Sequence, residues 1–144
     1  EIKTLRDLSV ADLEKVESLL PAALFPKAKH VITECNRVHE AADALKSGDL
    51  EHFGSLMKAS HQSLSRDFEV SCAELDFLAE KSWQLKGVIG SRMMGGGFGG
   101  CTINLVDNSQ LDSFQSQIKT AYLDRFEISP EFIPVKISAG AQLL

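Results

Sequence analysis

The densest chemical signal in the sequence is a run of glycines between two apolar segments. Residues 95–100 read GGGFGG, so half of the protein's 10 glycines stand within six positions. Each glycine in a strand or helix costs about 0.5–1 kcal/mol relative to alanine, so such a run needs a local reason. Successive exposed backbone N–H groups in a glycine loop bind phosphate oxygens. The sequence therefore predicts a phosphate loop, with a ligand-free hairpin turn as the alternative. Its residues are Gly95, Gly96, Gly97, Phe98, Gly99 and Gly100, and Phe98 is expected to hold the loop's shape.

The loop satisfies the pattern G-x-G-x-x-G at Gly95, Gly97 and Gly100, but its surroundings exclude the known users of that pattern. A dinucleotide-binding loop is followed directly by a helix, whereas the β-branched segment CTINLV follows here. The sequence also has no VAIK, HRD or DFG motif of a protein kinase and no Gly-Lys-Ser/Thr of a Walker A loop. We therefore expect a phosphate loop that joins two strands.

One charged side chain precedes the loop closely. Arg92 lies in the segment before the glycines, and its guanidinium is a candidate contact for a phosphate. A strand arginine also commonly faces solvent or a carboxylate, and that alternative stays open. No pair of carboxylates is assigned to general-base work, and no catalytic residue is assigned. The acidic residues interpreted as helix caps or solvated groups are Asp43, Asp49, Asp67 and Asp76.

Charge and composition narrow the class of protein. The 144 residues include 20 acidic residues and 15 lysines and arginines, a formal charge of −5, so nucleic acid is not expected as a partner. The longest apolar runs span only a few residues, and no membrane span or signal peptide is predicted. The three cysteines and four histidines show no metal-ligand spacing, so we expect no metal site, reduced thiols and a cytoplasmic location.

Helical periodicity dominates the first 85 residues. Ser9 and Ser71 each precede an acidic residue by three positions, which is the pattern of a capping box. Helices are predicted over residues 9–20, 27–46, 49–64, 71–85 and 109–121. The second helix is expected to bury one face, formed by Val31, Cys35, Val38, Ala42 and Leu45.

Strand patterns appear after residue 86. Two strands are predicted over residues 87–94 and 101–106. A last strand is predicted over 132–138, where Ile133, Val135 and Ile137 alternate, and Pro134 favours an edge position for it. One domain over residues 1–144 is expected, of class α+β, with helices packed on one face of a small antiparallel sheet.

Three stretches, in this order, resemble the GHMP small-molecule kinases in their galactokinase form. Residues 87–106, GVIGSRMMGGGFGGCTINLV, resemble the third signature motif of that family. Residues 27–64 are similar to its helix pair, including the GDL and SH positions, and residues 66–78, RDFEVSCAELDFL, resemble the segment that follows. The likeness covers nearly the whole chain.

The resemblance implies the fold of a GHMP kinase C-terminal domain and the ATP-dependent phosphorylation of galactose at its anomeric hydroxyl, with Mg²⁺. It also implies that the sugar motif, the ATP loop and the catalytic Asp and Arg of the family stand upstream of these residues. The chain begins at Glu1 rather than Met. We therefore expect a piece of a longer protein, whose missing N-terminal domain is its partner and without which it is inactive.

Two other functions remain open. One is a galactokinase-like sugar sensor or regulator, and the other is a related kinase for N-acetylgalactosamine or arabinose. Under any of them, the face that meets the N-terminal domain is expected to carry the loop and to expose Met93, Met94 and Phe98. Replacement of Gly97 by valine is expected to reduce kcat of the full-length enzyme and to leave the fold largely intact.

Overall fold

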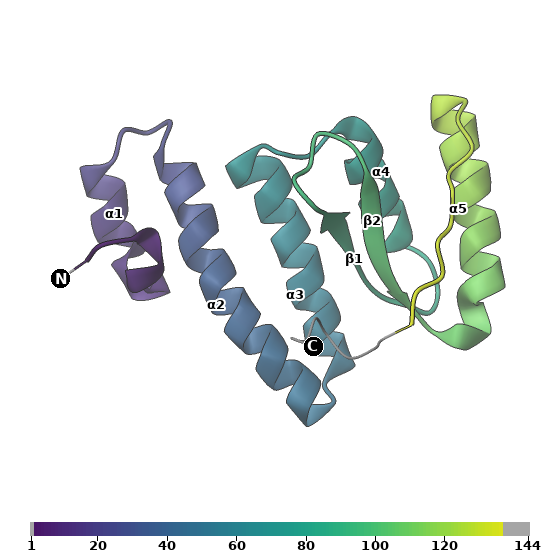
Figure 1. Ribbon diagram of the computed structural model, residues 1–144, viewed down its shortest axis with the longest axis horizontal. Helices are drawn as coiled ribbons and strands as arrows, with labels where there is room; N and C mark the ends of the chain where they lie inside the picture. Colours follow the sequence, from purple (N-terminus) through teal and green to yellow (C-terminus); the bar gives the residue numbers. More distant parts are fainter. Residues whose placement is uncertain (1, 137–144) are drawn as a thin grey trace, which may run out of the picture.

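The structure is a computed structural model that describes residues 2–136. Figure 1 shows its helices side by side, in chain order, with the hairpin of two strands between α3 and α5. The elements are the 3₁₀ turns Leu5–Asp7 (η1) and Val10–Asp12 (η2), α1 (Leu13–Leu19), α2 (Phe25–Ser47), α3 (Leu50–Ser63), the π-helical turn Leu64–Phe68 (η3), α4 (Ala73–Ser82), β1 (Val88–Met94), β2 (Cys101–Val106), the 3₁₀ turn Asn108–Gln110 (η4) and α5 (Leu111–Phe126).

The two strands form an antiparallel hairpin with one covered face. Arg92 pairs with Ile103 and Met93 pairs with Thr102, so partners on the two strands share a face. Ser91 and Met93 are buried, whereas Met94 and its partner Cys101 are exposed. Helices α3 and α4 pack against β1 from the covered side. This is the α+β arrangement that the sequence predicts, with helices on one face of a small antiparallel sheet.

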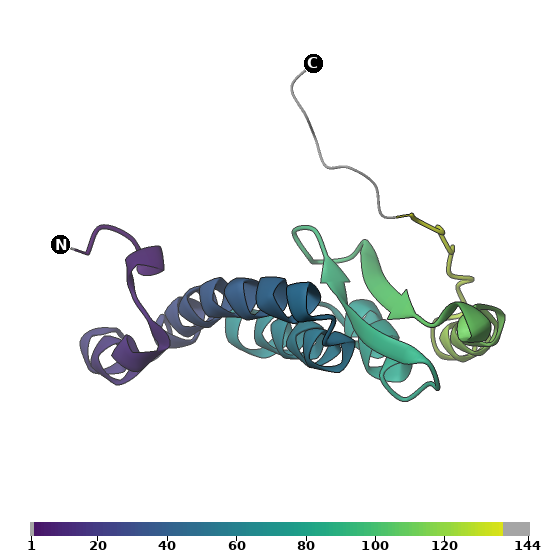
Figure 2. The ribbon, with the colours of Figure 1, turned by 90° about the horizontal axis from the view of Figure 1, so that it is seen from below.

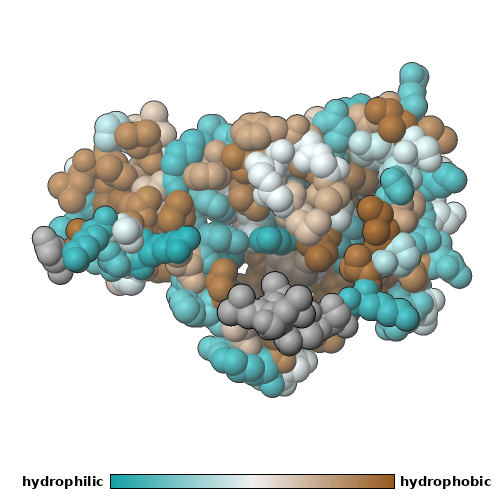
Figure 3. Space-filling model, in the orientation of Figure 1, coloured by the Kyte–Doolittle hydropathy of each residue, from teal (hydrophilic) through white to brown (hydrophobic). Residues whose placement is uncertain are grey.

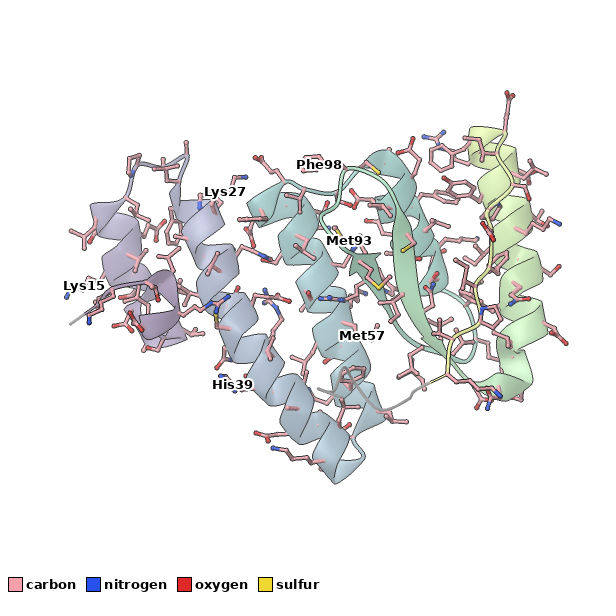
Figure 4. The ribbon with its side chains drawn as sticks, viewed as in Figure 1. Lys15, Lys27, His39, Met57, Met93 and Phe98 are labelled. Atoms are coloured by element: carbon pink, nitrogen blue, oxygen red, sulfur yellow. The ribbon has the colours of Figure 1, made fainter. Side chains whose placement is uncertain are left out.

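Two glycines allow α3 to lie directly on β1. A Cβ atom at Gly54 on α3 would stand 1.8 Å from the carbonyl oxygen of Ile89. A Cβ atom at Gly90 on β1 would stand 2.6 Å from Sδ of Met57. Any side chain at either position would separate the helix from the strand, so these glycines fix the depth at which α3 supports the hairpin. Figure 4 marks Met57 on this helix and Met93 on the strand.

Several helix ends follow the sequence signals. Ser9 and Asp12 form the predicted capping box ahead of α1. The carboxylate of Asp49 accepts the amide of His52 at 2.9 Å, and Gly48 ends α2 in the left-handed conformation with φ 75°. The cap predicted at Ser71 is wrong, because α4 begins after Cys72, and the Ser71 hydroxyl donates instead to Asp76.

The buried face of α2 differs from the prediction. Val38 and Leu45 are 60% and 52% exposed, while Ala28, Ile32 and Ala44 are buried. Small alanines admit α1 and α3 closely on that side of the helix, and the polar side chains there have hydrogen-bond partners. Apolar spacing along α2 was therefore a poor guide to its packing face.

The strand predicted over residues 132–138 is also wrong for its described part. Residues 132–136 have no strand partner, and Ile133 and Val135 are 73% and 76% exposed. Alternation shows only that a segment can form a strand; pairing needs a sheet edge within reach. Residues 137 and 138 lie outside the described part of the chain.

Candidate functional site

The glycine loop connects Met94 and Cys101, which face each other at the ends of the two strands. Figure 2 shows this turn projecting from the layer of helices. Backbone φ lies in the left-handed region at Gly95, Gly97, Gly99 and Gly100, whereas Gly96 lies outside it. Glycine adopts left-handed backbone conformations without the steric penalty that other residues incur. The backbone conformation of the loop therefore explains why it is rich in glycine. Successive backbone N–H groups in a turn can form a concavity that binds anions, which is the role that the sequence predicts for this loop.

The loop is anchored at its apex. The amide of Phe98 donates to the carbonyl oxygen of Val70 at 2.7 Å, which ties the loop to the segment between η3 and α4. Gly97 lies so close to this carbonyl that a Cβ atom there would stand 1.9 Å from the oxygen. The expectation that valine at Gly97 leaves the fold largely intact is therefore wrong, because this glycine is part of a packing contact.

The other glycines of the loop are open. A Cβ atom at Gly95, Gly96, Gly99 or Gly100 would have no heavy atom within 4 Å beyond its chain neighbours. Among the turn and loop hydrogen bonds of the described residues, Phe98 is the one loop position whose amide has a backbone acceptor. The loop thus combines a fixed apex with open backbone on both sides, where a ligand can approach closely.

Phe98 contacts the rest of the domain through its backbone, and its role in holding the shape of the loop stays a prediction. The residue is 76% exposed, and the contact recorded for it is the hydrogen bond from its backbone amide to Val70. Figure 4 marks Phe98 at the turn. Phe98, Gly99 and Gly100 line one side of a pocket of about 290 Å³. The other lining residues come from α4, its N-cap and α5: Cys72, Glu74, Leu75, Leu78 and Tyr122.

Arg92 pairs with side chains of two helices. Its Nη1 donates to Oγ of Ser60 at 2.8 Å and lies 3.5 Å from Oε1 of Glu34. Burial alone would raise the pKa of Glu34, but hydrogen bonds from Ser60 and Arg37 and the charge of Arg37 outweigh it and lower that pKa. A carboxylate partner was the alternative left open for Arg92, and a phosphate contact stays a prediction.

A buried histidine adjoins the start of the loop, and sequence reasoning missed it. His61 on α3 is 2% exposed, and its Nδ1 accepts the backbone amide of Met93 at 3.0 Å. Its Nε2 lies 3.1 Å from Oδ1 of Asp76 on α4. Burial is the main cause that lowers the pKa of His61, against the raising effect of Asp76 and Glu80. No local spacing reveals this contact, because its members come from three separate elements.

Apolar side chains are exposed on the hairpin beside the loop. Met94 is 47% exposed and Ile103 is 39% exposed. Figure 3 shows hydrophobic surface on this side of the molecule over the hairpin and toward α5. The predicted exposure is confirmed for Met94 and Phe98 and wrong for Met93, which is 1% exposed because it faces the helices.

The described residues hold no group of three or more His, Cys, Asp and Glu side chains placed to bind a metal ion. Cys35, Cys72 and Cys101 are all free thiols. A search of the described helices finds none with the length and apolarity needed to cross a bilayer.

Residues 41–124 match the family described as GHMP kinases C terminal. The chain belongs to this GHMP kinase family. The glycine loop, both strands and α3 to α5 up to residue 124 lie within the matched region. The fold is therefore that of a GHMP kinase C-terminal domain.

Galactokinases resemble this GHMP kinase domain over its full length. The galactokinase of Staphylococcus saprophyticus is 43% identical over the whole chain, which spans 38% of that protein. A crystal structure of Lactococcus lactis galactokinase complexed with galactose superposes with a TM-score of 0.86 and 37% identity, over 90% of this chain and 34% of that one. A mevalonate kinase structure from L. major gives a TM-score of 0.54 and 27% identity, over 83% of this chain and 35% of that one. The chain thus spans little more than a third of these relatives.

Proposed function

We propose that this domain is the C-terminal part of a galactokinase, which transfers the γ-phosphate of ATP to the anomeric hydroxyl of galactose. In that reaction the sugar oxygen forms a bond to the γ-phosphorus, the bond between this phosphorus and the bridging oxygen of ADP breaks, and the hydroxyl proton is released. The observation that carries the proposal is the glycine loop, open at four glycines and anchored at its apex. Identity of 43% to a galactokinase along the entire chain supports the choice of reaction.

The loop would serve the reaction by positioning and by charge. Phosphoryl transfer requires little covalent chemistry from a protein, and fixed donors near the phosphate oxygens stabilise the charge that develops there. The amides of Gly95, Gly96, Gly99 and Gly100 are the donors that we assign to this task. None of them has an acceptor among the turn and loop hydrogen bonds of the described residues, and the position that a side chain would take at each is open. The Val70–Phe98 hydrogen bond would keep these donors in place before the nucleotide arrives.

A second portion of polypeptide would complete the enzyme. Relatives are more than twice as long as this chain, so we propose that sugar recognition, the main ATP site and the catalytic groups reside in the remainder of the full-length protein. The exposed hairpin face, with Met94, Ile103 and the loop beside it, is the surface that we assign to contact that portion. Residues 1–144 alone are then expected to show no turnover.

Mg²⁺ accompanies the ATP that the proposal requires. The described residues do not fit a magnesium site, because they offer no cluster of three candidate ligands. No step of the reaction is therefore assigned to the ion through these residues. We further propose a cytoplasmic location, which the three free cysteines support.

The proposal is tested by release of ADP from the full-length protein with ATP and Mg²⁺. Galactose is the substrate expected to drive turnover, with N-acetylgalactosamine, arabinose and no sugar as parallel reactions. Turnover with one of the other sugars and not with galactose would identify a related kinase. Binding of galactose and ATP without ADP release would identify a sensor, and both outcomes contradict the proposed activity.

A further inference from the structure

A chain of polar contacts links the strand that leads into the glycine loop to the segment that anchors the apex of the loop. It begins at the amide of Met93, two residues before the first glycine, which donates to Nδ1 of His61. It continues from Nε2 of His61 to Oδ1 of Asp76 over 3.1 Å, a contact less direct than a linear hydrogen bond. Nε2 has no hydrogen-bond partner among the described residues, and Oδ1 of Asp76 is the charged atom recorded beside it. A buried ring nitrogen with no polar neighbour would destabilise the folded protein by about 1–3 kcal/mol. The position of Asp76 beside Nε2 therefore matters for how the ring is oriented.

The contacts dictate the tautomer of His61. An amide always donates, so Nδ1 must present its lone pair to Met93 and the ring hydrogen must reside on Nε2. That hydrogen lies on the side of the ring near Asp76, whose Oδ1 is 3.1 Å from Nε2 without the alignment of a hydrogen bond. The edge of the ring packs against Trp83, with centroids 5.6 Å apart, and the charged groups that act on it are Asp76, Glu80 and Arg92. A second proton on Nδ1 would abolish the bond to Met93.

Asp76 also holds the segment that anchors the apex of the loop. Its two carboxylate oxygens accept hydroxyl hydrogens from Ser71, at 2.6 Å, and Ser65, at 2.9 Å. Ser71 directly follows Val70, whose carbonyl oxygen binds the amide of Phe98. The carboxylate therefore fixes the neighbour of the anchor, and His61 fixes the strand that leads into the loop.

We propose that His61 and Asp76 are positioning residues for the glycine loop. They hold its first strand through the amide of Met93 and its apex through Ser71 and Val70. Neither side chain needs to touch a substrate for this role. That His61 and Asp76 help catalysis rests on the proposed function of the loop. That they hold the loop in place does not depend on that function.

The tautomer provides the first test. In the folded protein at pH 8, ¹H–¹⁵N spectra of the imidazole rings are expected to show His61 with its hydrogen on Nε2 alone. On acidification, the Met93 amide resonance should shift with the same midpoint as the His61 ring nitrogens. A hydrogen on Nδ1 at pH 8, or a Met93 resonance that does not follow His61, would overturn the proposal.

A matched pair of serine variants tests the link to the apex. Ser71→Ala and Ser65→Ala each remove one hydroxyl from Asp76, but Ser71 adjoins Val70 and Ser65 does not. Hydrogen exchange of the Phe98 amide is expected to become about tenfold faster in Ser71→Ala, as the loss of one hydrogen bond allows, and to change less than threefold in Ser65→Ala. Equal exchange in both variants would show that Asp76 supports the fold generally and does not position the loop.

Variants of His61 test the strand end of the chain. In His61→Ala, exchange of the Met93 amide should accelerate about tenfold relative to the wild type. His61→Gln, whose side-chain carbonyl can accept the same amide, should restore part of the protection. Ser82→Ala, which removes a buried hydroxyl bonded within α4, is the control for a general loss of packing. Acceleration of the same size in all three variants would contradict a specific role for His61. If His61→Ala does not fold, the tautomer and serine measurements decide the question.

These measurements separate the inference from the proposed function. They use the amides of Met93 and Phe98 and need no turnover. A loop that loosens in Ser71→Ala while kinase activity of the full-length protein stays unchanged would support the positioning and contradict the use of the loop in catalysis. A loop that stays equally protected in all variants would overturn the positioning, whatever the activity.

Discussion

The amide of Phe98 donates to the carbonyl oxygen of Val70 at 2.7 Å, and this bond sets the glycine loop against the segment before α4. Phe98 adopts φ 60° to make it, a conformation that costs a non-glycine residue on the order of 1 kcal/mol. Gly97 must lack a side chain for the same contact to close. One hydrogen bond therefore explains both the glycine before the apex and the unusual backbone of the aromatic residue on it.

Gly97→Ala is expected to destabilise the protein by roughly 3 kcal/mol. The new methyl group would clash with the carbonyl oxygen of Val70 and would also occupy a left-handed conformation with φ 83°. Urea unfolding, followed by the midpoint at constant slope, measures the change. Gly96→Ala is the control, since it adds the same methyl group in open space without a left-handed φ, and its stability should stay within about 0.5 kcal/mol of the wild type. Equal stability of the two variants would contradict the close approach at Gly97.

Gly95→Ala and Gly48→Ala form a matched pair for activity in the full-length protein. Both glycines have open space beside them and left-handed φ angles of 81° and 75°, so both variants should lose about 1 kcal/mol of stability. Only Gly95 lies in the loop, so kcat is expected to fall on the order of 10²-fold in that variant and to stay unchanged in Gly48→Ala. A similar kcat for the two variants would mean that the loop is only a turn.

Stability should fall as the pH drops below about 6.5, the ordinary histidine value. Burial lowers the pKa of both His30 and His61 in the folded protein, so the unfolded chain binds more protons below that value. The unfolding free energy then decreases toward acid, by at most about 1.4 kcal/mol per pH unit for each histidine, until the pH reaches the lowered folded pKa values. Urea unfolding between pH 8 and pH 5 measures the slope. Carboxylates with lowered pKa values, such as Glu34, also reduce the unfolding free energy toward acid, but at lower pH than the histidines do. A flat profile between pH 6.5 and pH 5 would contradict burial of these two neutral rings.

Local patterns in the sequence predicted the local parts of the structure. The hairpin, the cap at Asp49 and the stop at Gly48 each depend on residues within a few positions of one another, and each is where the pattern puts it. The prediction of the buried face of α2 was wrong, because burial depends on which helices pack against α2. Residues 132–136 form no strand, because alternating apolar and polar residues do not by themselves supply a neighbouring strand to pair with.

The site shows the same division. Composition identified the loop, but the roles within it depend on distant residues. Gly97 and Phe98 contact Val70, and His61 meets Asp76 and Met93 across three elements. The sequence left Arg92 open between a phosphate and a carboxylate, and contacts with α2 and α3 were needed to reveal its partner Glu34. Contacts between residues 15 to 58 positions apart leave no spacing that a single sequence reveals.

The central claim is that the open amides of the glycine loop bind the phosphates of a nucleotide. It is tested most directly by titrating the isotope-labelled full-length protein with a non-hydrolysable ATP analogue and following the glycine amide resonances. The account predicts saturable shifts at Gly95, Gly96, Gly99 and Gly100 and none at Gly48, an equally open glycine at the end of α2. Saturable nucleotide binding that leaves all four loop amides unshifted would contradict it.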